Sequence, residues 1–251
     1  MNYDGVSSAS DAGFILPPLV FGTLIRRHKR FLADVTLETG ETVTVHCPNS
    51  GSMKGCAVPG SKVFLSQSDN PKRKYRYTWE LVQVPKTLVG INTQVPNKFL
   101  KHCIEKGLIP DLSGYDRVTG EVKTSAHTRL DLLLEGSPDS ETGENRKCYI
   151  EIKNCTLVED GMAMFPDAVT KRGQKHLEEL EQLVGLGHRG VIFFLVQRMD
   201  AKGFRPADKI DKSYGEKLRK AFKNGVEIMV WDTVITARQI RMGQSLPICL
   251  D

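Results

Sequence analysis

Three carboxylates and one lysine between residues 121 and 153 have the types and spacing that a metal-dependent phosphodiesterase needs: Glu121, Asp131, Glu151 and Lys153. Glu151 and Lys153 are two residues apart on a predicted strand, so both side chains point to the same face of the sheet. Asp131 lies in the preceding predicted strand and faces Glu151 if the pairing register permits. Mg²⁺, or Mn²⁺ in its place, prefers hard oxygen ligands, usually carboxylates together with water and substrate phosphate. A neighbouring lysine can orient or activate the attacking water and offset charge on the phosphoryl oxygens.

A glutamine in the helix that follows extends this pattern. Gln174 lies near the start of the helix predicted over residues 167–186, together with Lys175 and His176. The first turns of a helix carry the positive end of its dipole and suit a phosphate group. A Glu-x-Lys triplet at a strand end is a weak signal by itself, since edge strands often alternate apolar and charged residues. The alternative for Glu151 and Lys153 is a cross-strand ion pair without a catalytic role.

The elements around these residues indicate an α/β fold. Residues 130–134 and 148–153 are strand-like runs joined by a polar, turn-rich loop at 136–147, which indicates a hairpin. Residues 191–196 are continuously apolar, as in a buried parallel strand. Strand, helix and strand of these lengths imply a right-handed βαβ unit. Three further elements complete the prediction: helices at 97–106 and 211–223, and a last buried strand at 226–231.

Short β-segments separated by turn residues fill the region from 19 to 86. Strands are predicted at 31–37, 42–46, 58–66 and 79–84, with a turn at 38–41. Such a run of short strands favours a small β-barrel, of which the OB-fold is one candidate. The pattern changes to helical spacing near Pro96. We therefore predict a disordered tail at 1–13, an OB-like nucleic-acid-binding domain at 14–90 and an α/β domain at 91–251.

The positive charge of the chain is concentrated in its first third. Residues 14–96 hold eleven Lys and Arg against five acids, whereas the rest of the chain holds 24 bases and 25 acids. Such a one-sided distribution is what a polyanion-binding surface needs. Lys and Arg neutralise phosphates, and interleaved aromatic rings stack on unpaired bases. The alternative is a solvated basic surface. The predicted nucleic-acid contacts form two clusters: Arg26, Arg27, Lys29 and Arg30, and Lys72, Arg73, Lys74 and Arg76.

Other features bound the class of protein. The turn-rich segment HCPNSGSMKGC at 46–56 is a candidate anion-binding nest, with Gly51 and Gly55 allowing tight turns. The six cysteines show no C-x-x-C pair and no zinc spacing, which predicts buried free thiols in a reducing compartment. No apolar run approaches the ~20 residues that cross a bilayer. The first residues contain no apolar block, so we expect a cytoplasmic protein without a membrane partner.

Several long blocks resemble the sugar fermentation stimulation protein A (SfsA) family. They include GTLIRRHKRFLADV (22–35), HCPNSGSMKGC (46–56), SDNPKRKYRYTWELV (68–82), YIEIKNCTL (149–157) and FPDAVTKRGQKHLEEL (165–180). The order of an acid, D-x(n)-E-x-K and a helix with Gln also resembles the PD-(D/E)xK nuclease superfamily, with Leu130 where that motif has proline. The resemblance implies an N-terminal OB-like domain, a C-terminal PD-(D/E)xK nuclease-like α/β domain, and DNA binding with little sequence specificity.

These observations lead to a hypothesis: a DNA-binding protein whose second domain is a Mg²⁺-dependent nuclease. Asp131, Glu151 and the Ile152 carbonyl would hold the metal. Lys153 would assist the water, Glu121 would complete the acidic site, and Gln174 would orient the lysine or the substrate. The alternative is a non-catalytic DNA-binding regulator of sugar (maltose) metabolism genes that keeps the nuclease fold. The strand state of the DNA, RNA as a substrate and the oligomeric state stay open.

Overall fold

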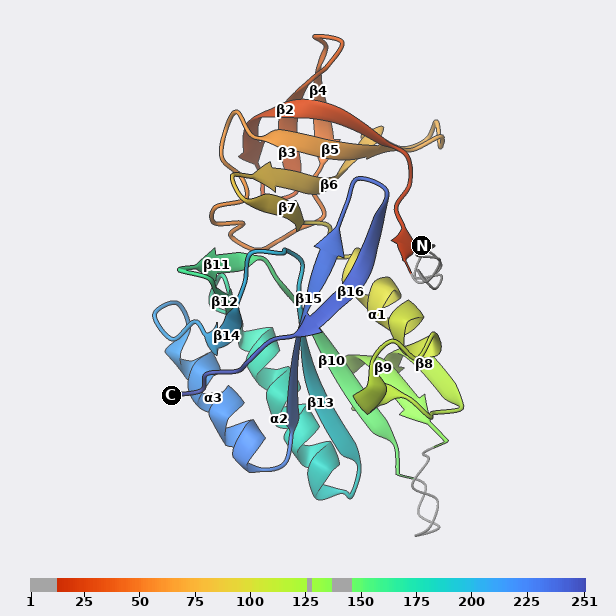
Figure 1. The fold of residues 1–251 in the computed structure, drawn as a ribbon, viewed down its shortest axis with the longest axis vertical. Helices are drawn as coiled ribbons and strands as arrows, with labels where there is room; N and C mark the ends of the chain where they lie inside the picture. Colours follow the sequence, from red (N-terminus) through yellow and green to blue (C-terminus); the bar gives the residue numbers. More distant parts are fainter. Residues whose placement is uncertain (1–12, 126–127, 137–145) are drawn as a thin grey trace, which may run out of the picture.

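The computed structural model describes residues 13–125, 128–136 and 146–251. The predicted tail lies outside the described residues except for Gly13, and so does most of the predicted 136–147 loop. Figure 1 shows a small β-barrel joined to a larger α/β domain. Within the described part of the chain, no helix is both long and apolar enough to cross a membrane. All six cysteines are free, and five of them are buried as predicted, whereas Cys249 is exposed.

The first domain is a closed five-stranded barrel with a sixth strand attached, so the OB-like expectation is confirmed. Its strands are β2 (Leu19–His28), β3 (Leu32–Leu37), β4 (Thr42–His46), β5 (Lys62–Gln67), β6 (Tyr77–Val84) and β7 (Thr87–Gly90). They pair in the order β4-β3-β2-β5-β6-β7, and a parallel pairing of His46 with Thr78 closes β4 onto β6. Alternation along β3 buries Ala33, Val35 and Leu37 inside the barrel.

The second domain is built on a seven-stranded sheet in the order β1-β16-β15-β13-β10-β9-β8. The central strands β10, β13 and β15 are parallel, and the outer pairings are antiparallel. The strands are β1 (Phe14–Ile15), β8 (Arg117–Lys123), β9 (Arg129–Glu135), β10 (Cys148–Cys155), β13 (Arg189–Val196), β15 (Glu227–Ile235) and β16 (Gln239–Ser245). A small second sheet contains β11 (Leu157–Glu159), β12 (Met162–Phe165) and β14 (Gly203–Pro206).

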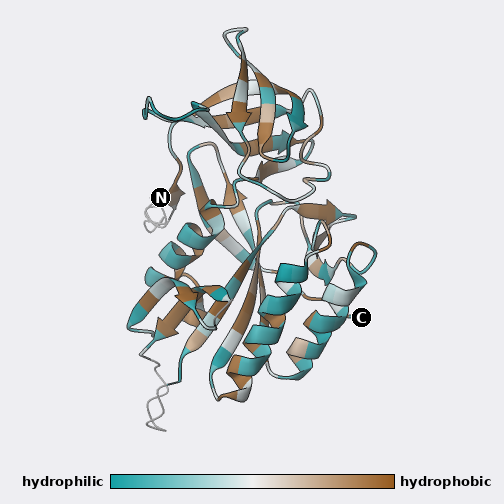
Figure 2. Ribbon diagram, turned by 180° about the vertical axis from the view of Figure 1, so that it is seen from behind, coloured by the Kyte–Doolittle hydropathy of each residue, from teal (hydrophilic) through white to brown (hydrophobic). Residues whose placement is uncertain are grey.

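Helices cover both faces of the large sheet: α1 (Val95–Glu105) on one side, and α2 (Lys171–Gly185) and α3 (Lys212–Lys223) on the other. The apolar residues of β13 contribute to the core on both faces of the sheet, because alternate side chains point to opposite faces. Phe193 packs with α1 residues in one core, and Phe194 packs with α2 and α3 residues in the other. The outward faces of α2 and α3 are mostly hydrophilic, as Figure 2 shows.

The predicted helix at 167–186 begins four residues later than expected, at Lys171. Thr170 is the N-cap, and its hydroxyl accepts a hydrogen bond from the Gly173 N–H. Residues 167–170 form a bend and irregular backbone, and the Asp167 carboxylate in this segment contacts the barrel. Residue 31 was likewise predicted to start a strand, but Phe31 belongs to the turn before β3, where Lys29 and Arg30 both have positive φ.

The first described strand does not belong to the barrel. β1 pairs antiparallel with β16, with Phe14 opposite Ile240, at the edge of the second domain's sheet. Phe14 and Ile15 therefore belong to the sheet of the second domain and not, as predicted, to the domain at 14–90. Their partner strand is more than 200 residues away in the sequence. A pairing between strands so far apart cannot be predicted from a local sequence pattern.

Candidate active site

A cavity of about 720 Å³ lies between the two domains, and the predicted acidic residues are in its wall. The barrel contributes Arg27, Arg30 and the loop from Asn49 to Ser52. The α/β domain contributes Asp131, Glu151, Ile152 and Lys153 from two neighbouring strands, and Arg172 and His176 from α2. The structure therefore brings most of the predicted catalytic residues together in one cavity between the domains.

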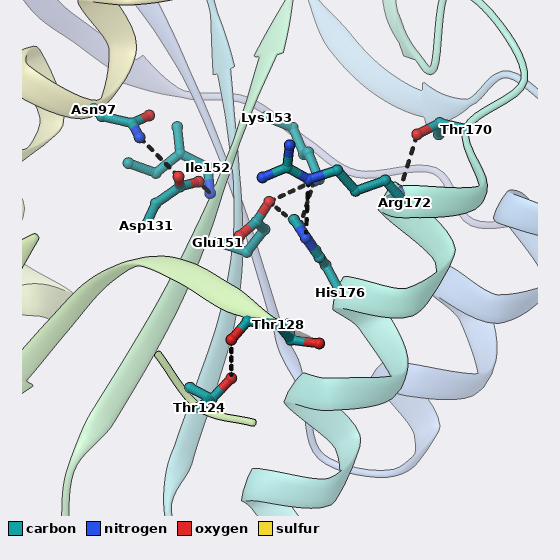
Figure 3. Close-up of polar contacts among 11 residues, drawn as sticks. Asn97, Thr124, Thr128, Asp131, Glu151, Ile152, Lys153, Thr170, Arg172 and His176 are labelled. Atoms are coloured by element: carbon teal, nitrogen blue, oxygen red, sulfur yellow. Dashed lines mark hydrogen bonds and ion pairs between the residues drawn. The ribbon is translucent and has the colours of Figure 1, made fainter. Parts of the chain in front are cut away.

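Glu151 and Lys153 form a buried ion pair on the face of β10 that meets α2 (Figure 3). The exposed fractions of the two residues are 3% and 9%, and the Lys153 Nζ donates to Glu151 Oε1 at 2.6 Å. His176 Nδ1 also contacts Glu151 Oε1, and it lies 3.3 Å from Lys153 Nζ. Burial raises the pKa of Glu151, but the Lys153 charge and the contact with His176 outweigh it, so the net pKa is lowered. Glu151 is therefore held in its ionised form.

Asp131 lies on β9 beside this pair. The last paired residues of β9 and β10 are Leu132 and Ile150. Continuing the same register by one residue places Asp131 opposite Glu151. Ladder pairing stops there, and the Asp131 carboxylate accepts the Ile152 N–H at 2.8 Å and the Asn97 Nδ2 at 2.7 Å. Burial and the neighbouring Glu151 charge raise the pKa of Asp131 to about 6. Two carboxylates that repel each other are thus held close together.

The donor set fits a hard divalent cation. Glu151 Oε2 is a buried oxygen without a hydrogen-bond partner among the described residues, and such an atom is costly unless something satisfies it. A cation would also remove the repulsion that raises the pKa of Asp131. No group of three or more His, Cys, Asp or Glu side chains is arranged for a metal within the described residues. The protein ligands would therefore be two carboxylates and the Ile152 carbonyl, with water in the remaining positions, which is common for Mg²⁺.

Two predicted catalytic residues do not line this cavity. Glu121 falls opposite Asp131 by the β8–β9 register, but its backbone has a φ of 58°, its side chain is 68% exposed, and it contacts Arg129 at 3.5 Å. The left-handed backbone interrupts the alternation of side chains along β8. Gln174 donates instead to the Asp211 carboxylate, at 3.2 Å and 3.3 Å, and so links α2 to the N-cap of α3.

Arg172 and His176 occupy the place predicted for Gln174. They are four residues apart and therefore neighbours on one face of α2, whereas Gln174 falls on another face. Arg172 Nε contacts His176 Nε2 at 3.4 Å, and Figure 3 shows the Arg172 side chain extending toward Lys153 and Glu151. The apolar residues of α2 carried a usable signal, because Leu177 and Leu180 are buried and His176 shares their side of the helix.

The predicted nucleic-acid contacts divide between the cavity and the outer surface. Arg27 and Arg30 line the cavity. Arg26 pairs with Asp34 at 2.9 Å and its side chain is 70% exposed, and Lys29 is in the exposed turn. The second cluster lies in the exposed loop between β5 and β6, away from the cavity lining: Lys72, Arg73, Lys74 and Arg76.

The loop at 46–56 forms part of the cavity wall and is fixed from two sides. Arg27 Nη2 donates to the carbonyls of Asn49 at 2.7 Å and Gly51 at 3.0 Å. From the other domain, Asp167 Oδ2 accepts from the Met53 N–H at 3.1 Å. A Cβ on Gly51 would lie only 2.6 Å from Asp167 Oδ2, so this close approach requires glycine. The loop was predicted to bind an anion, and the Met53 N–H binds the carboxylate of Asp167 from the same protein.

Comparison with known proteins gives matches over both domains. Residues 25–91 match the SfsA N-terminal OB domain, and residues 94–239 match the sugar fermentation stimulation protein RE domain. The sugar fermentation stimulation protein homologs of Pelobacter propionicus and Geobacter sulfurreducens are each 54% identical over 235 residues. These alignments cover 94% and 93% of this chain, and 99% and 98% of the relatives. The structure of Pyrococcus furiosus SfsA in complex with Ca²⁺ matches with a TM-score of 0.84 and 26% identity, over 94% of this chain and 98% of that one. The chain therefore belongs to the sugar fermentation stimulation protein (SfsA) family.

Proposed function

We propose that this protein binds DNA with little sequence specificity and hydrolyses its phosphodiester bonds with the help of Mg²⁺ or Mn²⁺. The observation that carries the proposal is the buried pair of Glu151 and Lys153 beside a second carboxylate, Asp131, at the wall of an interdomain cavity. A purely structural ion pair needs neither a second carboxylate that repels it nor a buried second oxygen, Glu151 Oε2, without a partner among the described residues. The Pyrococcus furiosus relative in complex with Ca²⁺ supports a site for a hard divalent cation.

The residues have distinct roles in this proposal. Asp131, Glu151 and the Ile152 carbonyl would hold the cation, which lowers the pKa of a bound water and neutralises charge on the phosphate. Lys153 can donate to the attacking water or to a phosphoryl oxygen, because its Nζ is already in the site and 2.6 Å from Glu151. Asn97 orients the Asp131 carboxylate, and His176 fixes that of Glu151. Arg172 is a further cation for the substrate phosphate.

The second candidate is a DNA-binding regulator without catalytic activity. It is favoured by the hydrogen bonds that both Asp131 oxygens and Glu151 Oε1 already make within the protein. A site closed on itself in this way would act only as structure. Metal binding separates the two functions, because a ligand that binds the folded state raises the melting temperature.

The test is to incubate the purified protein with labelled single- and double-stranded DNA and RNA, in Mg²⁺, Mn²⁺ or EDTA. We expect cleavage of DNA that needs the metal and falls at least about 100-fold in Asp131→Asn and in Lys153→Ala, the size of loss seen for one electrostatic catalytic group. Glu38→Gln, in an exposed turn of the barrel, is the matched control and keeps full activity. Binding without cleavage in every condition, with no Mn²⁺-induced rise in melting temperature, would favour the regulator.

A further inference from the structure

We infer that the interdomain cavity admits a single DNA strand and excludes a duplex, with Arg30 and Arg172 contacting its phosphates from opposite walls. The inference rests on the proposed function, since it takes the reacting phosphate to lie at Asp131 and Glu151. Both arginines line the cavity, Arg30 from the barrel and Arg172 from α2. The acidic pair lies in the same cavity, so a strand held by both guanidinium groups passes the site.

The size of the cavity favours a single strand. Its volume of about 720 Å³ lies within the range of about 300–1,000 Å³ that is usual for small-molecule sites. A short stretch of one strand fits such a space. A duplex needs more room than one strand, because its two sugar-phosphate backbones lie about 12 Å apart across the major groove.

The walls are also fastened to each other, so the cavity does not widen without breaking contacts. Asp167 of the α/β domain accepts from Ser52 Oγ at 3.2 Å and from the Met53 N–H. Lys54 of the barrel pairs with Glu159 of β11 at 2.7 Å. The Gly90 N–H at the end of the barrel donates to the Gln197 carbonyl at 3.0 Å. A duplex would have to break several of these contacts to enter.

The charges and the aromatic side chain near the cavity suit an unpaired strand. Neither Arg30 nor Arg172 has a carboxylate ion-pair partner within the described residues. Arg30 sits in a turn with a φ of 61°, directly after Lys29 with a φ of 49°. Such strained positions for non-glycine residues concentrate at functional sites. The next residue, Phe31, is 51% exposed, and an exposed ring can stack on an unpaired base but not on one inside a duplex.

The test measures DNA binding separately from cleavage, with the full chain in EDTA and by fluorescence anisotropy. One labelled oligonucleotide is used as a single strand and as a blunt duplex. We expect the single strand to bind at least about tenfold more tightly. Arg30→Asn and Arg172→Gln should each weaken its binding and reduce the slope of log K against log salt by about 0.7. Asparagine is chosen at residue 30 because it tolerates a positive φ, so the turn is preserved.

The matched control is Arg117→Gln, which removes an exposed arginine at the far edge strand β8 and should leave binding unchanged. Phe31→Ala should weaken the single strand about fivefold or more and leave the duplex unaffected. Equal or tighter binding of the blunt duplex, or single-strand binding that is insensitive to both arginine variants, would overturn the inference. Because no metal is present, these outcomes do not depend on cleavage. A protein that binds as expected but never cleaves DNA in Mg²⁺ or Mn²⁺ would overturn the proposed function alone.

Discussion

The two walls of the interdomain cavity are organised in opposite ways. In the α/β wall, side chains hold side chains: Lys153 and His176 both contact Glu151, and Asn97 contacts Asp131. In the barrel wall, a side chain fixes the backbone. Arg27 donates hydrogen bonds to the carbonyls of Asn49 and Gly51 in the loop and to the carbonyl of Arg30 in the turn after β2. The first wall is buried and charged, whereas the second presents loop backbone and the exposed guanidinium of Arg30.

This difference indicates that the two walls have different roles. Charged groups that are buried and bonded to each other keep a fixed geometry, which the proposed hydrolysis would require. A loop held by its carbonyls keeps a fixed shape without carrying reactive groups. We therefore expect changes in the α/β wall to alter stability and chemistry strongly, and changes in the barrel wall to alter the shape of the cavity with a smaller cost.

The largest effect is expected from Glu151→Ala, which leaves the Lys153 ammonium buried without its partner. Breaking a buried ion pair in this way costs about 3–5 kcal/mol of unfolding free energy. Adding Lys153→Met should recover much of that loss, because the unpaired charge is then gone. Urea denaturation of both single variants and the double variant measures the coupling. A cost for Glu151→Ala below about 1 kcal/mol would mean that the α/β wall is no more tightly organised than an exposed ion pair.

A smaller effect is expected from Arg27→Ala in the barrel wall. The change removes hydrogen bonds to the carbonyls of Asn49, Gly51 and Arg30, and bonds from a charged donor are worth about 1.5–3 kcal/mol. The neighbouring Arg26→Ala is the matched control, because it removes an exposed pair with Asp34 worth about 0–1 kcal/mol. Chemical denaturation gives both values. Equal costs for the two variants would show that the loop does not depend on Arg27.

The smallest effect is expected from a carboxylate of the barrel outside the cavity. Hydrogen bonds from Arg26, Thr44 and His28 lower the pKa of Asp34 from 3.8 to about 2. Because the folded pKa is the lower one, the stability that Asp34 contributes is complete above pH 3.8 and is lost as the pH falls toward 2. Unfolding free energies measured across this range should fall less steeply in Asp34→Asn than in the unmodified protein. Identical slopes would assign the acid sensitivity to other carboxylates.

The parts of the site that follow from local rules could be predicted from the sequence. Alternation along one strand places Glu151 and Lys153 on one face, and a hairpin places Asp131 opposite Glu151, one step beyond the last paired residues, Ile150 and Leu132. The barrel and the α/β architecture also follow from turn residues and apolar periodicity. These features depend only on residues that are close in the sequence or on one continuous element.

The remaining parts depend on backbone geometry, on helix rotation and on contacts between residues far apart in the sequence. The left-handed backbone at Glu121 turns its carboxylate away from the site, and glutamate has no special preference for that conformation. The place of Gln174 depended on the rotation of α2 against the sheet, which the stripe formed by His176, Leu177 and Leu180 sets. Arg27 and Asp167 both contact the loop at 46–56, through residues that are more than 20 positions from Arg27 and more than 110 positions from Asp167 in the sequence. Local sequence patterns do not predict such contacts.

The pairing of β1 with β16 makes the barrel an insertion within the α/β domain, because the large sheet contains strands from both before and after it. The two domains are thus not consecutive modules that can be cut apart at residue 91. A fragment containing only the later residues would lack β1 and leave the backbone groups of β16 unpaired at the edge of the sheet, where edge-to-edge association begins. In terms of folding, the α/β sheet is completed only when both ends of the inserted barrel have been brought together. The topology therefore links the formation of the barrel to that of the domain that holds the acidic site.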